Sequence, residues 1–182
     1  MKRVAVLVSG GGTNLQALLE SEAQGENPNG KIVLVVASKP GVYALERAAN
    51  FGVESAVVAR KEYADSDAFD AALLDTLQSH QIDVVVLAGF LSVLGPRVIE
   101  AYRNRILNVH PSLIPSFCGP GFYGLRVHEA ALARGVKVTG ATVHLVNEEC
   151  DGGPILLQKR VMVEAEWKLL PQALAMVCND EV

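Results

Sequence analysis

The sequence lacks the patterns that would place it in a membrane, on a nucleic acid or around a structural metal. Across its 182 residues, no apolar run approaches the roughly 20 residues that a membrane-spanning helix needs. The net charge is −4 and basic residues form no block, so neither nucleic acid nor an anionic membrane is an expected partner. Only three cysteines are present, with no Cys-x-x-Cys spacing that would indicate zinc: Cys118, Cys150 and Cys178.

The odd number of cysteines and their long spacings predict reduced thiols in a cytoplasmic protein. The N-terminal stretch MKRVAVLVSGGG has too short an apolar run for a signal peptide and predicts a first strand instead. The length suits one domain, 1–182, with a sizeable core.

Apolar, β-branched segments alternate with helical patterns along the first two thirds of the chain. Unbroken apolar runs at 4–8, 32–37 and 84–88 predict strands that are buried on both faces. Further helices and strands are expected at 14–24, 43–51, 55–59, 65–79, 96–101 and 106–109. This βαβα order predicts an α/β fold with a doubly wound, mostly parallel sheet.

The pattern changes in the last third of the chain. A helix is predicted at 127–134, followed by two strands at 138–146 and 155–161. Only the short polar segment 147–154 joins these strands, which predicts an antiparallel pair near the C-terminal edge of the sheet. A last helix is predicted at 164–177.

The segment SGGGTN, residues 9–14, follows the first predicted strand and opens the first helix. Glycines let the backbone approach a ligand, and a helix N-terminus offers free N–H groups, so we predict a phosphate site. The alternative is a plain turn capped by Thr13 or Asn14. The Walker pattern is absent, and the third glycine of G-x-G-x-x-G would fall at Leu15. The second strand ends in Ala-Ser-Lys without an acid for a ribose, so a small phosphorylated substrate is favoured over a dinucleotide.

Two polar residues, Asn108 and His110, interrupt the apolar run ILNVHPSLIPS. Their spacing places both on one face of a strand that Pro111 ends. An imidazole transfers protons near neutral pH, and an amide donates to an oxyanion, which indicates a catalytic pair. Asp151, in a D-G-G turn, is the candidate to orient His110, although a structural Asx turn is the commoner role for such a residue.

The other histidines carry weaker signals. His144 alternates with Val143 and Leu145, which predicts a satisfied strand residue rather than a ligand. Neither His80 nor His128 has metal-ligand spacing with another histidine, so no metal is predicted.

Four segments together resemble the folate-dependent formyltransferases, and within them the phosphoribosylglycinamide formyltransferase family. They are SGGGTNLQALLE, VVVLAGFLSVL, ILNVHPSLIPSFCGPGFYG and HLVNEECDGGPILLQ. N-x-H-P-S-L-x-P with a later D-G-G-P marks the superfamily, and the S-G-x-G-[ST]-N start marks the glycinamide ribonucleotide branch.

The resemblance implies a cytoplasmic, Rossmann-like transferase of purine biosynthesis that uses no metal. The amine of glycinamide ribonucleotide would attack the formyl carbon of 10-formyltetrahydrofolate. The match to Asn108 would stabilise the oxyanion, the match to His110 would transfer a proton, and the match to Asp151 would support the histidine. The expected partners are small molecules, and a homodimer is compatible with this interpretation.

The resemblance also implies a phosphate-binding half, 1–100, and a folate-binding and catalytic half, 101–182. The nucleotide would contact Gly12, Thr13, Asn14 and Glu166. The folate would contact Leu91, Ser92, Val93, Leu94, Asn108, Asn147, Glu148, Glu149, Cys150 and Asp151. Without the resemblance, 90–94 would be interpreted as a strand end in the core. Ser66 stands where many relatives have an arginine, and the segment before Glu166 is shorter than in relatives.

Other functions remain open at this point. A formyltetrahydrofolate hydrolase usually has an extra N-terminal domain, and a methionyl-tRNA formyltransferase has an extra C-terminal one; we expect neither here. A non-catalytic phosphate-binding module would use only the SGGGTN segment and would need no imidazole at His110.

Overall fold

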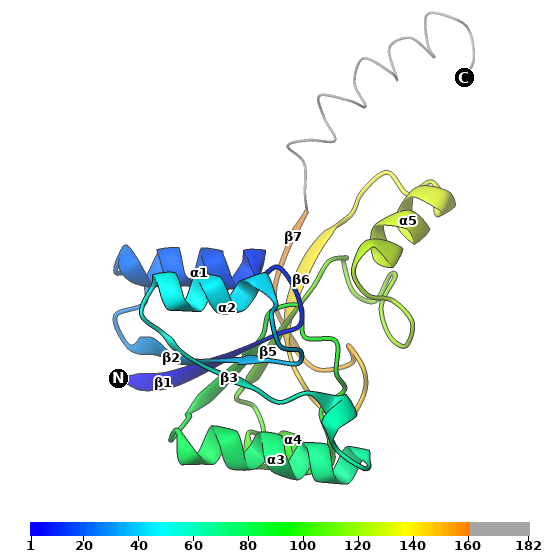
Figure 1. Ribbon diagram of the computed structural model, residues 1–182. Helices are drawn as coiled ribbons and strands as arrows, with labels where there is room; N and C mark the ends of the chain where they lie inside the picture. The colour runs from blue at the N-terminus through cyan, green and yellow to red at the C-terminus, as the bar shows by residue number, and fades with distance from the viewer. Residues whose placement is uncertain (161–182) are drawn as a thin grey trace, which may run out of the picture.

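A twisted sheet of seven strands forms the centre of the computed structural model, which describes residues 1–160 (Figure 1). The strands lie in the order β3-β2-β1-β4-β5-β6-β7. Their bounds are β1 (Lys2–Val8), β2 (Gly30–Ala37), β3 (Glu54–Val57), β4 (Val84–Leu87), β5 (Ile106–His110), β6 (Gly140–Leu145) and β7 (Ile155–Arg160).

The first five strands are parallel, β6 runs against them, and β7 reverses again to run in their direction. β1 pairs in parallel with β2 and β4, β2 with β3, and β4 with β5. β6 is antiparallel to both β5 and β7. The predicted doubly wound, mostly parallel sheet with an antiparallel pair near its C-terminal edge is confirmed.

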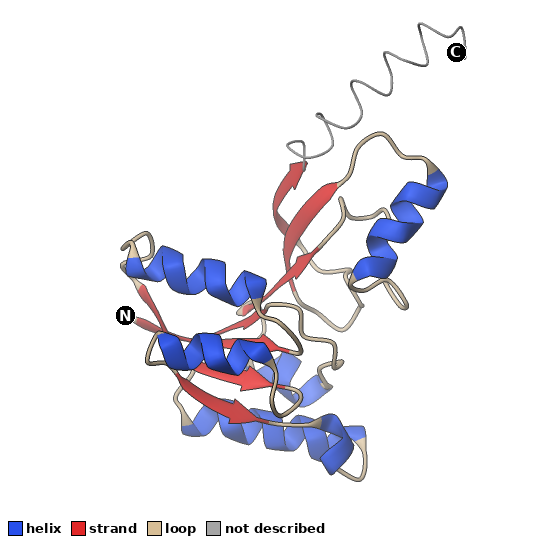
Figure 2. Ribbon diagram, turned by 45° about the horizontal axis from the view of Figure 1, so that its top comes forward, coloured by secondary structure: helices blue, strands red, loops and turns tan. Residues whose placement is uncertain are grey.

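Helices cover the two faces of the parallel part of the sheet (Figures 1 and 2). α1 (Thr13–Ala23) and α2 (Tyr43–Asn50) lie on one face, where one apolar cluster forms. α3 (Ser66–Ser79) and α4 (Pro96–Ala101) lie on the other face and close a second cluster. A short 3-10 helix, Arg60–Glu62, precedes α3, and α5 (Leu125–Arg134) lies apart, near the β6 end of the sheet. Apolar strands between two helical layers explain the unbroken apolar runs in the sequence.

The predicted elements within residues 1–160 match to within two residues, in the first strands as well as in the last third. β6 begins at Gly140, two residues after its predicted start, and α5 begins at Leu125, two residues before. α5 ends at Arg134, and the left-handed conformation of the following Gly135 is the usual stop for a helix. The predicted helix 164–177 lies outside the described residues. Among residues 1–160, no helix has the length and apolar character needed to cross a bilayer.

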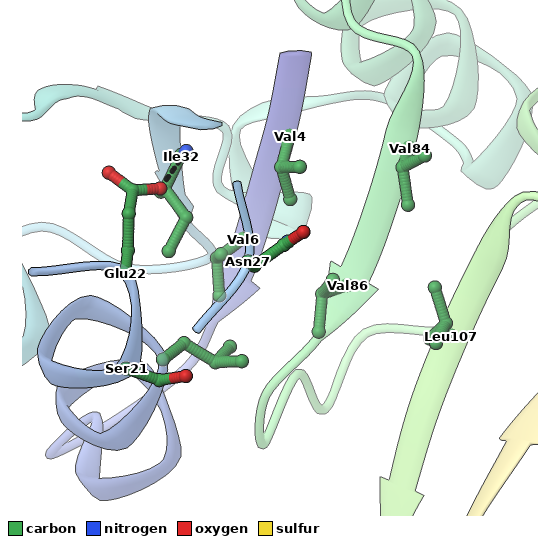
Figure 3. A pocket seen from close by; sticks show the side chains of 10 residues that line it. Val4, Val6, Ser21, Glu22, Asn27, Ile32, Val84, Val86 and Leu107 are labelled. Atoms are coloured by element: carbon green, nitrogen blue, oxygen red, sulfur yellow. Dashed lines mark hydrogen bonds between the residues drawn. The ribbon is translucent and has the colours of Figure 1, made fainter. Parts of the chain in front are cut away.

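One hollow lies between α1 and the sheet (Figure 3). Its walls are mainly the aliphatic side chains of four strands, including Val6, Val86 and Leu107. Glu22 also lines it, but its carboxylate accepts a hydrogen bond from the backbone N–H of Ile32 at 2.5 Å. This hollow therefore offers packing space rather than chemistry, and the reactive side chains lie elsewhere.

Candidate functional site

The first loop, residues 9–14, joins β1 to α1 and leaves the start of the helix open. Gly12 is the N-cap residue, with a left-handed backbone at φ 72°. A side chain at this position would also meet the Cβ of Ala44 at 2.7 Å, so only glycine fits without a shift. Thr13 is the first residue of α1, and Thr13 and Asn14 are both exposed. A cap by Thr13 or Asn14 is therefore the wrong interpretation, and the free N–H groups of the helix remain available to an anion.

A cation from α2 supports this loop. The Arg47 guanidinium donates to the Gly11 carbonyl at 2.8 Å and to Gln16 Oε1 at 2.8 Å. It also lies over the Tyr43 ring, 4.8 Å from its centroid. A fixed positive charge beside the helix N-terminus adds to the attraction for an anion. Sequence reasoning missed Arg47, because only the packing of α2 against α1 brings it to the loop.

The segment after β4, residues 89–95, presents two apolar side chains to solvent. Leu91 is 55% exposed and Val93 is 87% exposed, whereas Leu94 is buried in the core. The interpretation of 90–94 as a core strand end is therefore wrong for Leu91 and Val93 and right for Leu94. The backbone leaves the sheet after Leu87, so the side chains of the segment no longer alternate between two covered faces.

Asn108 and His110 end the fifth strand, as the sequence predicted. His110 is 4% exposed, and its Nε2 donates to the Phe117 carbonyl at 2.8 Å. Its Nδ1 lies 3.5 Å from Asp151 Oδ2. The imidazole thus has an oxygen acceptor on each side, an arrangement that suits a ring that accepts a second proton during a reaction.

Asp151 lies at the centre of the cluster. Its Oδ2 accepts from the Gly119 N–H at 2.9 Å, and its Oδ1 lies 3.4 Å from Asn108 Nδ2. Asp151 has a left-handed backbone at φ 55°, a conformation that Asp tolerates better than most residues. The structure therefore brings Asp151 next to both Asn108 and His110.

His144 is the member that sequence reasoning missed. It is buried, as expected of a satisfied strand residue, but its Nε2 faces Asn108 Nδ2 at 3.1 Å and Asp151 Oδ1 at 3.5 Å. Its Nδ1 donates to the Leu145 carbonyl at 2.9 Å. The antiparallel register of β5 and β6 places His144 directly opposite Asn108. The signal was present, because Thr142 and His144 repeat the i, i+2 polar spacing of Asn108 and His110.

Two pKa shifts follow from this geometry. The hydrogen bond with His144 outweighs burial and, with the Gly119 N–H and the charge of His110, holds the pKa of Asp151 below its usual value. Burial acts to lower the pKa of His144, but hydrogen bonds with Asp151 and the Leu145 carbonyl outweigh it and raise the pKa above its usual value. Asp151 is therefore a carboxylate at neutral pH.

The loop that carries Asp151, residues 147–154, is fixed by its own contacts. Asn147 Oδ1 accepts from the Glu149 N–H at 3.0 Å, and the Glu148 carboxylate pairs with Arg103 at 2.6 Å. Burial and the neighbouring Asp151 charge raise the pKa of the Cys150 thiol, which therefore stays protonated. Backbone groups of this loop, rather than its thiol, are the available polar contacts for a ligand.

The cluster combines an amide donor, an imidazole and a carboxylate at the carboxyl edge of the sheet, where ligands of such folds bind. It can transfer a proton and stabilise an oxyanion, which are the requirements of acyl transfer. In residues 1–160 no group of three or more His, Cys, Asp and Glu side chains is arranged to hold a metal ion. Glu166, predicted to contact the nucleotide, lies outside the described residues.

Comparison with known proteins connects this geometry to a family. The family model described as formyl transferase matches residues 2–169. A phosphoribosylglycinamide formyltransferase of Haemophilus influenzae is 40% identical over 91% of this chain and 76% of its own length. The crystal structure of the phosphoribosylglycinamide formyltransferase from Bacillus halodurans is 38% identical with a TM-score of 0.83, covering 96% of this chain and 89% of that one. A trifunctional purine biosynthetic protein of Drosophila melanogaster is 40% identical over 98% of this chain, but the chain spans only 14% of that protein.

Proposed function

Because the chain belongs to the formyl transferase family, we propose that it transfers the formyl group of 10-formyltetrahydrofolate to the amine of glycinamide ribonucleotide, a step of purine biosynthesis. The observation that carries this proposal is the contact of one buried carboxylate, Asp151, with Asn108, His110 and His144. A module that only binds phosphate has no use for such a cluster.

Each member of the cluster has a distinct proposed role in the transfer. The substrate amine attacks the formyl carbon, and the formyl oxygen becomes an oxyanion. Asn108 Nδ2 lies 3.1 Å from His144 Nε2, and its N–H that makes the longer contact with Asp151, at 3.4 Å, is given to that oxyanion. His110 moves the proton between the attacking amine and the folate nitrogen that leaves. Asp151 orients the imidazole and stabilises its protonated form.

The two ligands are assigned to different parts of the carboxyl edge. The phosphate of the nucleotide binds at Gly12, Thr13 and Asn14, supported by the open helix N-terminus and by Arg47. The ring system of the folate packs on Leu91 and Val93, supported by their exposure on a segment that the fold holds in place. Ser92 and the backbone of 147–151 contribute polar contacts to the folate. Glu166, which the resemblance implies for the nucleotide, completes the proposed set.

A spectrophotometric assay with 10-formyltetrahydrofolate, run with and without glycinamide ribonucleotide, tests the proposal. Deformylation of the folate only when the nucleotide is present, with formylated nucleotide as product, is the expected result. Release of formate without the nucleotide would assign the chain to hydrolysis instead. Binding of the nucleotide without any turnover would reduce the chain to a binding module.

A further inference from the structure

Two buried serines connect the first loop to the segment after β4. Ser9 stands directly after β1, and Ser38 stands directly after β2. The Ser38 hydroxyl donates to Ser9 Oγ at 2.6 Å, and the Leu91 N–H donates to the same oxygen at 2.8 Å. Both serines are almost fully buried. Dinucleotide-binding folds have an acid near the end of the second strand, whereas this chain has Ser38 in the corresponding region, bonded to Ser9 rather than to a ligand.

The other end of the segment is fixed as well. Asp70, fully buried on α3, accepts from the Gly95 N–H and the Arg97 N–H at 2.8 Å each. A side chain at Gly95 would collide with the Asp70 carboxyl group, so the backbone passes as close to Asp70 as a glycine allows. The backbone of the segment 89–95 is therefore held at Leu91 and at Gly95, while the side chains of Leu91 and Val93 are exposed.

From these contacts we infer that Ser9 and Ser38 are positioning residues for the folate, resting on the function proposed above. Ser9 ties the backbone of Leu91 to the end of β1, and so holds in place the apolar surface assigned to the folate. Ser38 acts only through Ser9, because its hydroxyl bonds to Ser9 Oγ and orients it. An apolar surface on a fixed backbone loses less conformational entropy when it binds a flat ring than a mobile one would.

Steady-state kinetics of Ser9→Ala, Ser38→Ala and the double variant test this inference. Ser9→Ala should raise the KM for 10-formyltetrahydrofolate about three- to tenfold, the factor that one hydrogen bond is worth, with kcat and the KM for the nucleotide nearly unchanged. Ser38→Ala should give a smaller rise, and the double variant should match Ser9→Ala alone. If the effects of the two single variants add in the double variant, or if the KM values for folate and nucleotide rise equally, the inference is wrong. Either result would indicate that each substitution loosens the packing independently and disturbs both sites.

A second measurement does not depend on turnover. Hydrogen exchange of the Leu91 amide, followed by mass spectrometry of peptides over 88–95, should accelerate in Ser9→Ala. Thr76→Ala is the matched control, because it also removes one hydroxyl hydrogen bond, to the Ala72 carbonyl on α3, far from both loops. Unchanged exchange in Ser9→Ala would overturn the positioning role. A wild-type chain that fails to bind 10-formylfolate in a calorimetric titration would instead overturn the proposed function.

Discussion

The two regions at the carboxyl edge of the sheet are built from different parts of the polypeptide. The first loop, residues 9–14, offers backbone N–H groups from consecutive residues, and its one strict requirement is the conformation of Gly12. The cluster around Asp151 combines side chains from β5, β6 and the loop 147–154, and its members Asn108 and Asp151 are 43 residues apart in the sequence. A site built from backbone N–H groups is disturbed by a change of backbone conformation but tolerates changes of side-chain chemistry. A cluster of side chains is disturbed by changes of side-chain chemistry, even where the backbone stays the same.

Removal of the His110 imidazole should give the largest difference between catalysis at the Asp151 cluster and nucleotide binding at the first loop. His110→Ala is expected to lower kcat by about 10²- to 10⁴-fold, the usual contribution of acid–base catalysis, while nucleotide binding at the first loop stays intact. Turnover and calorimetric binding of the nucleotide measure the two effects. His80→Ala is the matched control, because that histidine pairs with Glu54 at the far end of α3. A proportional loss of nucleotide affinity in His110→Ala would contradict the separation.

Asp151→Asn tests the same cluster without a change of shape. Asparagine tolerates the left-handed backbone and still accepts from the Gly119 N–H, so the fold should remain. The loss of charge should lower kcat by roughly a hundredfold, within the range for acid–base assistance. Thermal unfolding checks the fold and the formyl-transfer assay checks the rate. A near-full rate would show that Asp151 does not support His110.

Gly12→Ala tests the region built from backbone. The new side chain would meet both an unfavourable φ of 72° and the Cβ of Ala44 at 2.7 Å, so the start of α1 must shift. The nucleotide KM should rise about tenfold through weakened hydrogen bonds to a charged group, and stability should fall by about 1–3 kcal/mol. Gly10→Ala is the control for stability, because a side chain there meets open space. Equal destabilisation by both variants would show that the conformation of the loop does not specifically require glycine at position 12.

His144→Asn measures the contribution of the missed residue. Asparagine can still donate to the Leu145 carbonyl, but it lacks the Nε2 that lies 3.1 Å from the Asn108 amide. Asn108 should then lose its fixed orientation, and kcat should fall about three- to tenfold, as for one neutral hydrogen bond. Crystal structures of the variant and the wild type would show whether the Asn108 amide rotates. An unchanged rate would make His144 a purely structural residue.

The smallest expected effect is on the pH dependence of stability. The lowered pKa of Asp151 stabilises the fold above about pH 4, the usual range of an Asp, and this contribution disappears as the pH falls through the lowered pKa. The raised pKa of His144 stabilises the fold below about pH 6.5, and this contribution disappears as the pH rises through the raised pKa. The difference in free energy of unfolding between wild type and Asp151→Asn should therefore be largest between these values. Urea titrations across pH measure it, and a difference independent of pH would contradict the pairing.

Local patterns were enough for much of this molecule. The unbroken apolar runs predicted strands between helical layers, and the glycines before α1 predicted an open helix start, because both features depend on neighbours in sequence. The same reasoning failed for Leu91 and Val93. Their apolar character is typical of core residues, and only the exit of the backbone from the sheet after β4 exposes them.

The sequence by itself determined the alternation of strands and helices and the shared face of Asn108 and His110, since each follows from spacing along the chain. Only the tertiary structure decided which residues distant in sequence contact Asn108 and His110. The reversal of β6 set His144 opposite Asn108, and the turn at 147–154 returned Asp151 to both histidines. The physical reason is that strand order and register depend on packing of the whole sheet, which no short pattern encodes.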